Sequence, residues 1–278
     1  MRVEGELATK SSGAQLVSKK ANRPSKKGKR RQRRPDCKPT MVQRLFDTCK
    51  VVFAEATAGF VPPPEDVSRI RSILDSLKPT DVGLSPKLPF FKNIDTSMPP
   101  SITYLHVYEC HQFSIGIFCL PPSAIIPLHN HPGMTVFSKI LFGSMHIKSY
   151  DWVVVSQDSV EDPIEALSSG ERLAKVKTDE VFTAPCETSI LYPASGGNMH
   201  CFTAKTKCAV LDVLGPPYSI PDRNCTYYYD RVYAKHAGES PLDIGQGDGY
   251  SWLHERAGQP EELLVIGAEY SGPTIVEG

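Results

Sequence analysis

Two histidines separated by one residue are the clearest candidates for chemistry in this sequence. His129 and His131 flank Asn130 and are followed by Pro132 and Gly133, a pair typical of turns. On an extended strand, residues at i and i+2 share one face, so both imidazoles can reach one metal ion. In a chain with 8 histidines such a pair can arise by chance, and surface or core histidines are then the default interpretation. The pair predicts a metal site if a further ligand can be found.

The surroundings of this pair resemble the first motif of the cupin superfamily, in which His-x-His is followed by a glutamate and then by a glycine. Gly143 matches the glycine, but a threonine or a valine stands where the family has its carboxylate ligand. Residues 193–200 resemble the second cupin motif, a turn that delivers one more histidine from a later strand. The resemblance implies that His129, His131 and His200 are the metal ligands.

Three imidazoles give a site different from the common set of two histidines and one carboxylate, because neutral ligands leave the full charge of a divalent cation uncompensated. Such a centre favours an anionic thiolate as an additional ligand, while open positions on the opposite face can admit O2. Zinc also accepts three histidines. The ligands alone therefore leave the metal open between iron(II) and zinc.

A longer resemblance is more specific. Residues 127–152 and 215–219 are similar to the plant cysteine oxidases, relatives of animal cysteamine dioxygenase, and the similarity extends over residues 40–258. It implies an Fe(2+) enzyme that uses O2 to oxidise the N-terminal cysteine of a protein to cysteine sulfinic acid. The implied substrates are transcription factors, the group VII ethylene response factors. Their oxidation would feed the Arg/N-degron pathway of protein degradation in the hypoxia response.

The same resemblance assigns catalytic roles to Asp212 and Tyr218. Asp212 lies twelve residues after His200, in an apolar stretch where a carboxylate is costly unless it is paired, so a substrate ammonium is a plausible partner. The alternative is a carboxylate satisfied by backbone amides or a lysine. Tyr218 could hydrogen-bond bound oxygen or sulfur, or could simply pack.

Cys225 and Tyr227 form a further pair at i and i+2, so that on extended chain both face the same way. Related thiol dioxygenases join such a pair by a thioether. An ordinary strand cysteine beside an aromatic run is the alternative, and we prefer it slightly.

The elements that must position these residues are mostly short strands. Apolar residues recur every three or four positions over 41–54 and 62–77, which predicts two amphipathic helices. After Ser101, runs rich in Val, Ile, Tyr, Phe and Thr alternate with turn residues. Strands are expected at 102–108, 113–120, 135–142, 146–152, 173–183, 199–203, 208–214 and 227–233. The predicted fold class is mainly β, a double-stranded β-helix (cupin) barrel with N-terminal α-helices.

Charge is distributed unevenly although the formal net charge is zero. Residues 1–40 hold 13 Lys+Arg against 3 Asp+Glu, which leaves 18 against 28 for the rest of the chain. A segment so basic and so poor in apolar residues cannot bury enough surface to offset its conformational entropy. We expect 1–40 to be a disordered tail with a nuclear-import signal, and the protein to be in nucleus and cytoplasm.

The remaining features predict a soluble intracellular enzyme. The 8 cysteines are scattered without a CxxC pair, which favours free thiols in a reducing compartment, and no apolar run is long enough to span a membrane. A monomer that does not bind nucleic acid directly is expected, with a catalytic domain over 41–258 and a C-terminal tail of unassigned role over 259–278. The competing interpretations are a zinc or other-metal cupin that acts on a small molecule, and a non-catalytic cupin whose basic tail binds nucleic acid.

Overall fold

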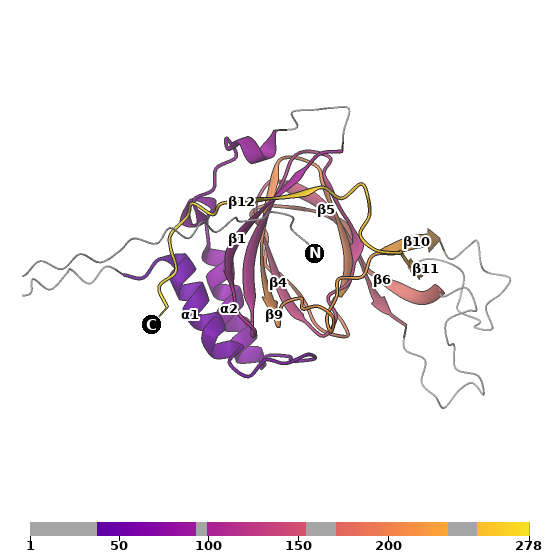
Figure 1. Ribbon diagram of the computed structural model, residues 1–278, viewed down its shortest axis with the longest axis horizontal. Helices are drawn as coiled ribbons and strands as arrows, with labels where there is room; N and C mark the ends of the chain where they lie inside the picture. The colour runs from indigo at the N-terminus through magenta and orange to yellow at the C-terminus, as the bar shows by residue number, and fades with distance from the viewer. Residues whose placement is uncertain (1–37, 93–98, 154–170, 233–248, 278) are drawn as a thin grey trace, which may run out of the picture.

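A computed structural model describes residues 38–92, 99–153, 171–232 and 249–277, which form a β-barrel flanked by helices (Figure 1). Two six-stranded sheets make up the barrel, in the orders β12-β1-β2-β9-β4-β7 and β10-β11-β6-β5-β8-β3. The strands of the first sheet are β1 (Ile102–Glu109), β2 (Ser114–Leu120), β4 (Thr135–Phe142), β7 (Ser189–Leu191), β9 (Cys208–Gly215) and β12 (Val265–Ala268). Those of the second are β3 (Ile125–His129), β5 (Ser144–Trp152), β6 (Glu171–Thr183), β8 (Met199–Ala204), β10 (Tyr228–Val232) and β11 (Tyr250–Glu255). The expected double-stranded β-helix is confirmed.

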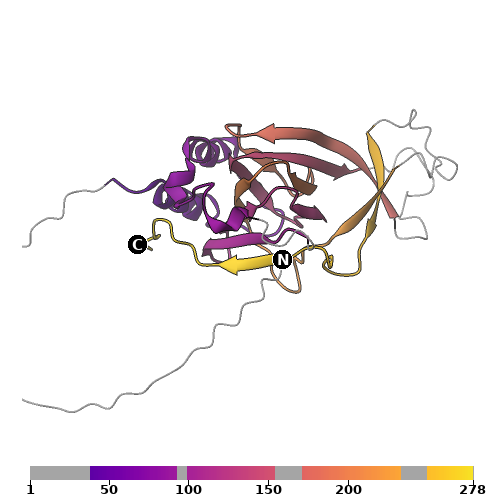
Figure 2. The same cartoon turned by 90° about the horizontal axis from the view of Figure 1, so that it is seen from above.

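Two helices cover the outer side of the first sheet (Figure 2). The helix α1 (Met41–Val52) begins at Thr40, whose hydroxyl accepts a hydrogen bond from the amide of Gln43, 3.1 Å away. The helix α2 (Pro64–Ser76) begins with proline and two acidic residues, which suit the first turn. Their buried faces pack on apolar side chains of β1, β2, β4 and β9. Short 3₁₀ helices, η1 (Pro79–Val82) and η2 (Pro89–Phe91), follow.

A buried lysine fixes α2 to the barrel. Lys139 on β4 is 5% exposed, and its Nζ lies 3.0 Å from Asp75 Oδ1 at the end of α2. The same carboxylate oxygen accepts hydrogen bonds from the amide and hydroxyl of Thr188, at 2.8 and 2.7 Å. Because a buried ammonium is costly unless it is paired, this network explains how an outward-facing lysine is tolerated beneath a helix.

The C-terminal residues belong to the barrel instead of forming a separate tail. The strand β12 pairs in parallel with β1, so the sheet extends beyond residue 258, where the sequence suggested that the catalytic domain ends. Further along, Val276 and the side chain of Gln43 on α1 exchange two hydrogen bonds, of 2.8 and 3.0 Å. The segment after β12 therefore runs back to the helices and holds its strand in place.

Within the described part of the chain, no helix is long and apolar enough to cross a membrane. The basic segment over 1–40, with its expected import signal, falls almost wholly outside the described residues.

Candidate active site

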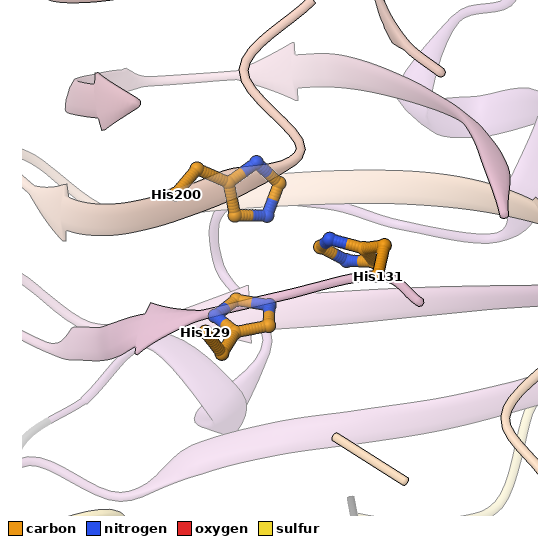
Figure 3. A group of neighbouring side chains, drawn as sticks. All are labelled: His129, His131 and His200. Carbon is orange, nitrogen blue, oxygen red and sulfur yellow. The ribbon is translucent and has the colours of Figure 1, made fainter. Parts of the chain in front are cut away.

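Three histidines, two from neighbouring strands and one from the turn that follows the first of these strands, converge inside the barrel (Figure 3). His129 ends β3 and is paired in register with His200 on β8, while His131 lies in the turn that follows β3. Each histidine offers one ring nitrogen, and these three nitrogens lie within 4.8 Å of one another. The three side chains are buried. The sequence spacing and the second cupin motif thus identified residues that the fold does bring together.

Backbone carbonyls fix the orientation of two of these rings. His129 Nδ1 lies 2.8 Å from the carbonyl oxygen of Pro127, and His131 Nδ1 lies 3.1 Å from that of Asn198. A carbonyl can only accept a hydrogen bond, so each Nδ1 carries the proton. The lone pair is then on Nε2, the state in which metal-ligating histidines are commonly held.

Burial keeps all three imidazoles neutral. It lowers the pKa of His129 to about 4 and that of His131 to about 3, and it lowers the pKa of His200 well below its ordinary value. At neutral pH each ring can bind a metal without first losing a proton. Three neutral nitrogen donors in a buried pocket fit a divalent first-row metal such as Fe(2+) or Zn²⁺.

An asparagine that sequence reasoning missed holds the turn containing His131. The side chain of Asn198 accepts from the amide of His131 at 3.1 Å and donates to its carbonyl oxygen at 2.9 Å. Its amide group also donates to the carbonyl oxygen of Tyr192, at 2.9 Å. The His131 backbone is thereby clamped to the segment that delivers His200.

The turn before Asn198 is organised by a carboxylate from another strand. Asp151, at the end of β5, accepts hydrogen bonds from the amides of Gly196, Gly197 and Asn198, at 3.1, 2.8 and 3.3 Å. Both glycines have positive φ, 82° and 83°, which other residues rarely adopt. The Gly-Gly pair was the only sequence signal for this arrangement, and it indicates the turn but not its partner.

Asp212 lies on the inner face of the first sheet. On β9 it is in register with Ser138 of β4 on one side and with Gly116 of β2 on the other. Its side chain is buried, and Oδ1 has no hydrogen-bond partner among the residues that the structure describes. Burial raises the pKa of Asp212 to about 7, although a hydrogen bond from Ser138 opposes the rise. Neither backbone amides nor a lysine satisfies this oxygen.

Tyr218 lies beside the histidines, with its ring centroid 5.8 Å from that of His131. Its hydroxyl donates to the carbonyl oxygen of Asn130, 2.8 Å away. The observed contact supports the turn between His129 and His131. A hydrogen bond from Tyr218 to oxygen or sulfur stays a prediction, and it requires the hydroxyl to give up the carbonyl oxygen of Asn130 as its acceptor.

Cys225 and Tyr227 are also close to the site. Cys225 lines the same cavity as the histidines, and the ring of Tyr227 lies 6.1 Å from that of His129. Burial, reinforced by the Cys225 thiol, raises the pKa of Tyr227, so its hydroxyl keeps its proton. The two side chains are neighbours as separate groups, and a thioether between them stays a prediction.

One cavity of about 1010 Å³ joins these residues to the surface. The three histidines, Asp212, Tyr218 and Cys225 line its inner part. Residues of β1 and β2 and of the segment that begins with β12 line the rest, including Tyr104, His106, Glu109, Gly116, Gly267 and Glu269. The C-terminal residues therefore contribute to the site, which the sequence did not suggest.

Comparison with known proteins gives the family. The PCO_ADO family model matches residues 73–275. This chain belongs to the PCO_ADO family. The match begins within α2 and continues past β12, in agreement with a barrel that extends beyond residue 258.

Curated relatives agree with this assignment. The chain is 58% identical to plant cysteine oxidase 2 and 53% identical to plant cysteine oxidase 1 of Arabidopsis thaliana, over 85% of this chain and 83% and 80% of those proteins. It is 31% identical to human 2-aminoethanethiol dioxygenase, over 76% of this chain and 82% of that protein. These names are those of thiol oxidases and dioxygenases, so the chain is an enzyme, an oxidoreductase of the thiol dioxygenase family.

Among solved structures, an RmlC-like cupin protein from Desulfovibrio desulfuricans aligns with 48% of this chain and 97% of that chain, at 18% identity and a TM-score of 0.29. The cupin assignment for this chain comes from its own sheet topology.

Proposed function

We propose that this protein is an Fe(2+)-dependent dioxygenase that oxidises the N-terminal cysteine of target proteins to cysteine sulfinic acid. The observation that carries the proposal is one cavity that holds three neutral, convergent histidines and, beside them, a buried carboxylate oxygen without a partner. The histidines suit a metal that binds a thiolate, and the carboxylate suits the ammonium next to that thiolate in an N-terminal cysteine. Relatives named as cysteine oxidases support the substrate class.

The reaction needs no reductant. A thiol and O2 combine to give a sulfinic acid: sulfur loses four electrons, O2 gains four, and both oxygen atoms end on sulfur. When bound at the three histidines, iron(II) would supply the redox step that lets O2 react with the thiol. The chain itself supplies the neutral ligands and holds the substrate's ammonium group.

Asp212 would provide the binding energy for that ammonium group. A buried carboxylate whose pKa is raised toward neutrality gains an ion pair when a cation arrives, and the cation favours the ionised form. Losing such a partner leaves a buried charge unpaired, which costs on the order of a few kcal/mol. The site should therefore discriminate strongly against a cysteine whose amino group is blocked.

Iron is favoured over zinc by the reaction class of the family. Zinc has no redox chemistry and suits hydrolysis, whereas the relatives are named as oxidases and dioxygenases. A cupin that hydrolyses or isomerises a small molecule, or a non-catalytic cupin with a nucleic-acid-binding tail, lacks such support.

In the cell, the proposed substrates are transcription factors with an N-terminal cysteine, with group VII ethylene response factors as first candidates. Their oxidation would start degradation through the Arg/N-degron pathway, so that low O2 stabilises them. The basic N-terminal segment motivates location in nucleus and cytoplasm, where such substrates occur.

Mass spectrometry of a Cys-initiated peptide after aerobic incubation with the iron-loaded enzyme tests the proposal. Under ¹⁸O2 the peptide should gain two oxygen atoms, both labelled. The same peptide acetylated at its N-terminus should react about 10²- to 10³-fold more slowly, because it lacks the ammonium group. Label in only one of the two atoms, or equal rates for both peptides, would contradict the mechanism. Zinc-loaded enzyme is the control for the metal.

A further inference from the structure

The cavity is larger than an N-terminal cysteine needs. Its volume of about 1010 Å³ lies at the upper end of the usual range for small-molecule pockets. It also extends from the histidines across three further strands, β2, β1 and β12, to the edge of the first sheet. The residues that follow the cysteine in a protein substrate can occupy this outer part.

The sheet register defines a row of positions along the cavity wall. Asp212 on β9 faces Gly116 on β2, which in turn faces His106 on β1. On the edge strand β12, Ala268 is paired in register with Leu105, the residue before His106. Glu269 follows Ala268 in the chain. The row runs from the buried carboxylate of Asp212 to the exposed carboxylate of Glu269, and every member lines the cavity.

Glu109, at the end of β1, adds a second carboxylate to the outer part. Its side chain is 53% exposed and lies 3.9 Å from His106, measured between carboxylate oxygen and ring nitrogen. Among the described residues that line the cavity there is no lysine or arginine. The side chains of the wall therefore include three carboxylates, one inner and two outer, and no lysine or arginine that could pair with them.

A tyrosine connects the two ends of this wall. A Cβ at Gly116 would lie 2.5 Å from Tyr104 Oη, so the glycine leaves room for the phenol. Burial, with contributions from Glu109 and Asp212, raises the pKa of Tyr104 to about 12. The phenol thus keeps its proton and can donate a hydrogen bond to a peptide carbonyl midway along the cavity.

The dimensions relate the outer carboxylates to positions in a substrate. Neighbouring strands lie about 4.8 Å apart, so three strand steps from Asp212 to Glu269 span roughly 14 Å. An extended peptide covers about 3.4 Å per residue, and roughly four residues therefore span this distance. With the α-ammonium at Asp212, the side chains of about the third to fifth residues lie near Glu109 and Glu269.

We propose that the outer cavity is a peptide groove in which Glu109 and Glu269 select substrates with Lys or Arg at about positions 3 to 5 after an N-terminal cysteine at position 1. This inference rests on the proposed function and adds a substrate class to it. The buried, unpartnered Oδ1 of Asp212 fixes the cationic end of the peptide in the inner cavity. The exposed carboxylates then attract a second cation further along. Since exposed ion pairs are weak, the selection is expected to be about 3- to 10-fold in kcat/KM.

Peptides that differ only at one position test the groove. The peptides Cys-Gly-Gly-Lys-Ala-Ala amide and Cys-Gly-Gly-Glu-Ala-Ala amide are compared with Cys-Gly amide, which is too short to reach the outer carboxylates. The full-length, iron-loaded enzyme is used, and sulfinic acid is measured by mass spectrometry. The lysine peptide should have the higher kcat/KM in dilute buffer, and the preference should shrink in about 0.5 M NaCl, where exposed charges are screened.

Two sets of variants locate the effect. The double substitution Glu109→Gln and Glu269→Gln should abolish the preference, so that the ratio of kcat/KM for the lysine peptide to that for the glutamate peptide falls from about 3- to 10-fold to about one. Glu180→Gln, at an exposed glutamate on β6 that does not line the cavity, should keep the preference. Equal kcat/KM for the lysine and glutamate peptides, or a preference that survives the double substitution, would overturn the groove. Oxidation of Cys-Gly amide in the same experiment would still uphold the proposed function. No oxidation of any of the three peptides would overturn the proposed function and the groove with it.

Discussion

At the scale of single residues, the site depends on groups that are costly to bury. His129, His131 and His200 are neutral because of their burial, and Asp212 is held near its titration point for the same reason. Each of these groups loses hydration in the folded protein and keeps at least one nitrogen or oxygen atom for a metal or a substrate. Residues of this kind typically mark functional sites.

Replacing Asp212 with asparagine should make the empty enzyme more stable and less active. Between the ordinary carboxyl pKa and about 7, the folded protein binds a proton that the unfolded chain has released, so stability falls as pH rises through this window. At pH 8 the penalty is about 4 kcal/mol, at roughly 1.4 kcal/mol per pKa unit. Asparagine has the same shape and cannot ionise.

Urea unfolding of the metal-free Asp212→Asn variant and of the metal-free unchanged protein measures this difference in stability. Asp212→Asn should exceed the unchanged protein in stability by several kcal/mol at pH 8 and by little at pH 4. The iron-loaded variant should turn over a Cys-initiated peptide with a kcat/KM that is lower by about 10²-fold or more. A stability difference that is the same at both pH values would show that Asp212 does not titrate in this window.

The residues of the site were predictable where the chemistry is carried by residue type and spacing. Two histidines at i and i+2, and a histidine after a Gly-Gly turn, are visible in the sequence. Asn198 and Asp151 were missed because their hydrogen bonds join segments 45 to 67 residues apart, and neither residue type is distinctive by itself.

At the scale of elements, three of the strands that the sequence analysis missed, β3, β11 and β12, lack a clear strand pattern, each for a different reason. The strand β3 contains Pro127, which argues against a central strand, but β3 is an edge of its sheet and needs one row of hydrogen bonds only. In β11 the polar Ser251 is buried among apolar neighbours, so the inside-outside alternation is broken. The strand β12 has four residues and includes Gly267, and it is a strand because β1 offers it a partner.

The turn before β8 should control metal affinity through Asn198. Replacing Asn198 with alanine removes two hydrogen bonds to the His131 backbone but leaves the bond between the His131 ring and the Asn198 carbonyl in place. Loss of an outer partner of a metal ligand typically weakens binding about 10- to 100-fold. The metal-free variant should therefore bind Fe(2+) anaerobically with a dissociation constant larger by that factor.

Asn224→Ala is the matched control, because Asn224 is an exposed asparagine whose side chain donates to the carbonyl oxygen of Pro221. It should bind iron as tightly as the unchanged protein. If Asn198→Ala folds and keeps full affinity, His131 is held by its ring contact alone.

At the scale of the whole molecule, the barrel and the basic N-terminal segment should be separable. Deleting residues 1–37 keeps every described residue, including all the described residues that line the cavity. We expect kcat/KM for a Cys-initiated peptide to change by less than about twofold, and nuclear enrichment of a tagged protein to be lost. Microscopy of the truncated and full-length proteins, with replacement of the ten basic residues 19–34 by glutamine as a second variant, separates charge from length. Unchanged enrichment of both variants would place the import signal elsewhere.

Acid should unfold the metal-free barrel because of its three buried histidines. Below the ordinary imidazole pKa of 6.5, the unfolded chain binds protons that the folded protein excludes, so stability falls as pH drops from 6.5 toward 4. For His129 the loss amounts to about 3 kcal/mol, at roughly 1.4 kcal/mol per unit. Above pH 6.5 these histidines no longer make the free energy of unfolding depend on pH.

The variant His131→Asn isolates this contribution, because an amide cannot take up the proton. In the presence of a chelator, its stability in urea should exceed that of the unchanged protein at pH 5 and approach it at pH 7.5. Replacing His111, an exposed histidine, with asparagine should change neither value. Asp212 has the opposite pH dependence, but it is present in all three proteins and so cancels in the comparison.

Adding Fe(2+) anaerobically should stabilise only the proteins that keep all three ligands, since a metal that binds the folded state alone raises the free energy of unfolding. Equal stability of His131→Asn and the unchanged protein at pH 5 would mean that His131 is protonated within the folded barrel, and the neutral three-histidine site would then be wrong.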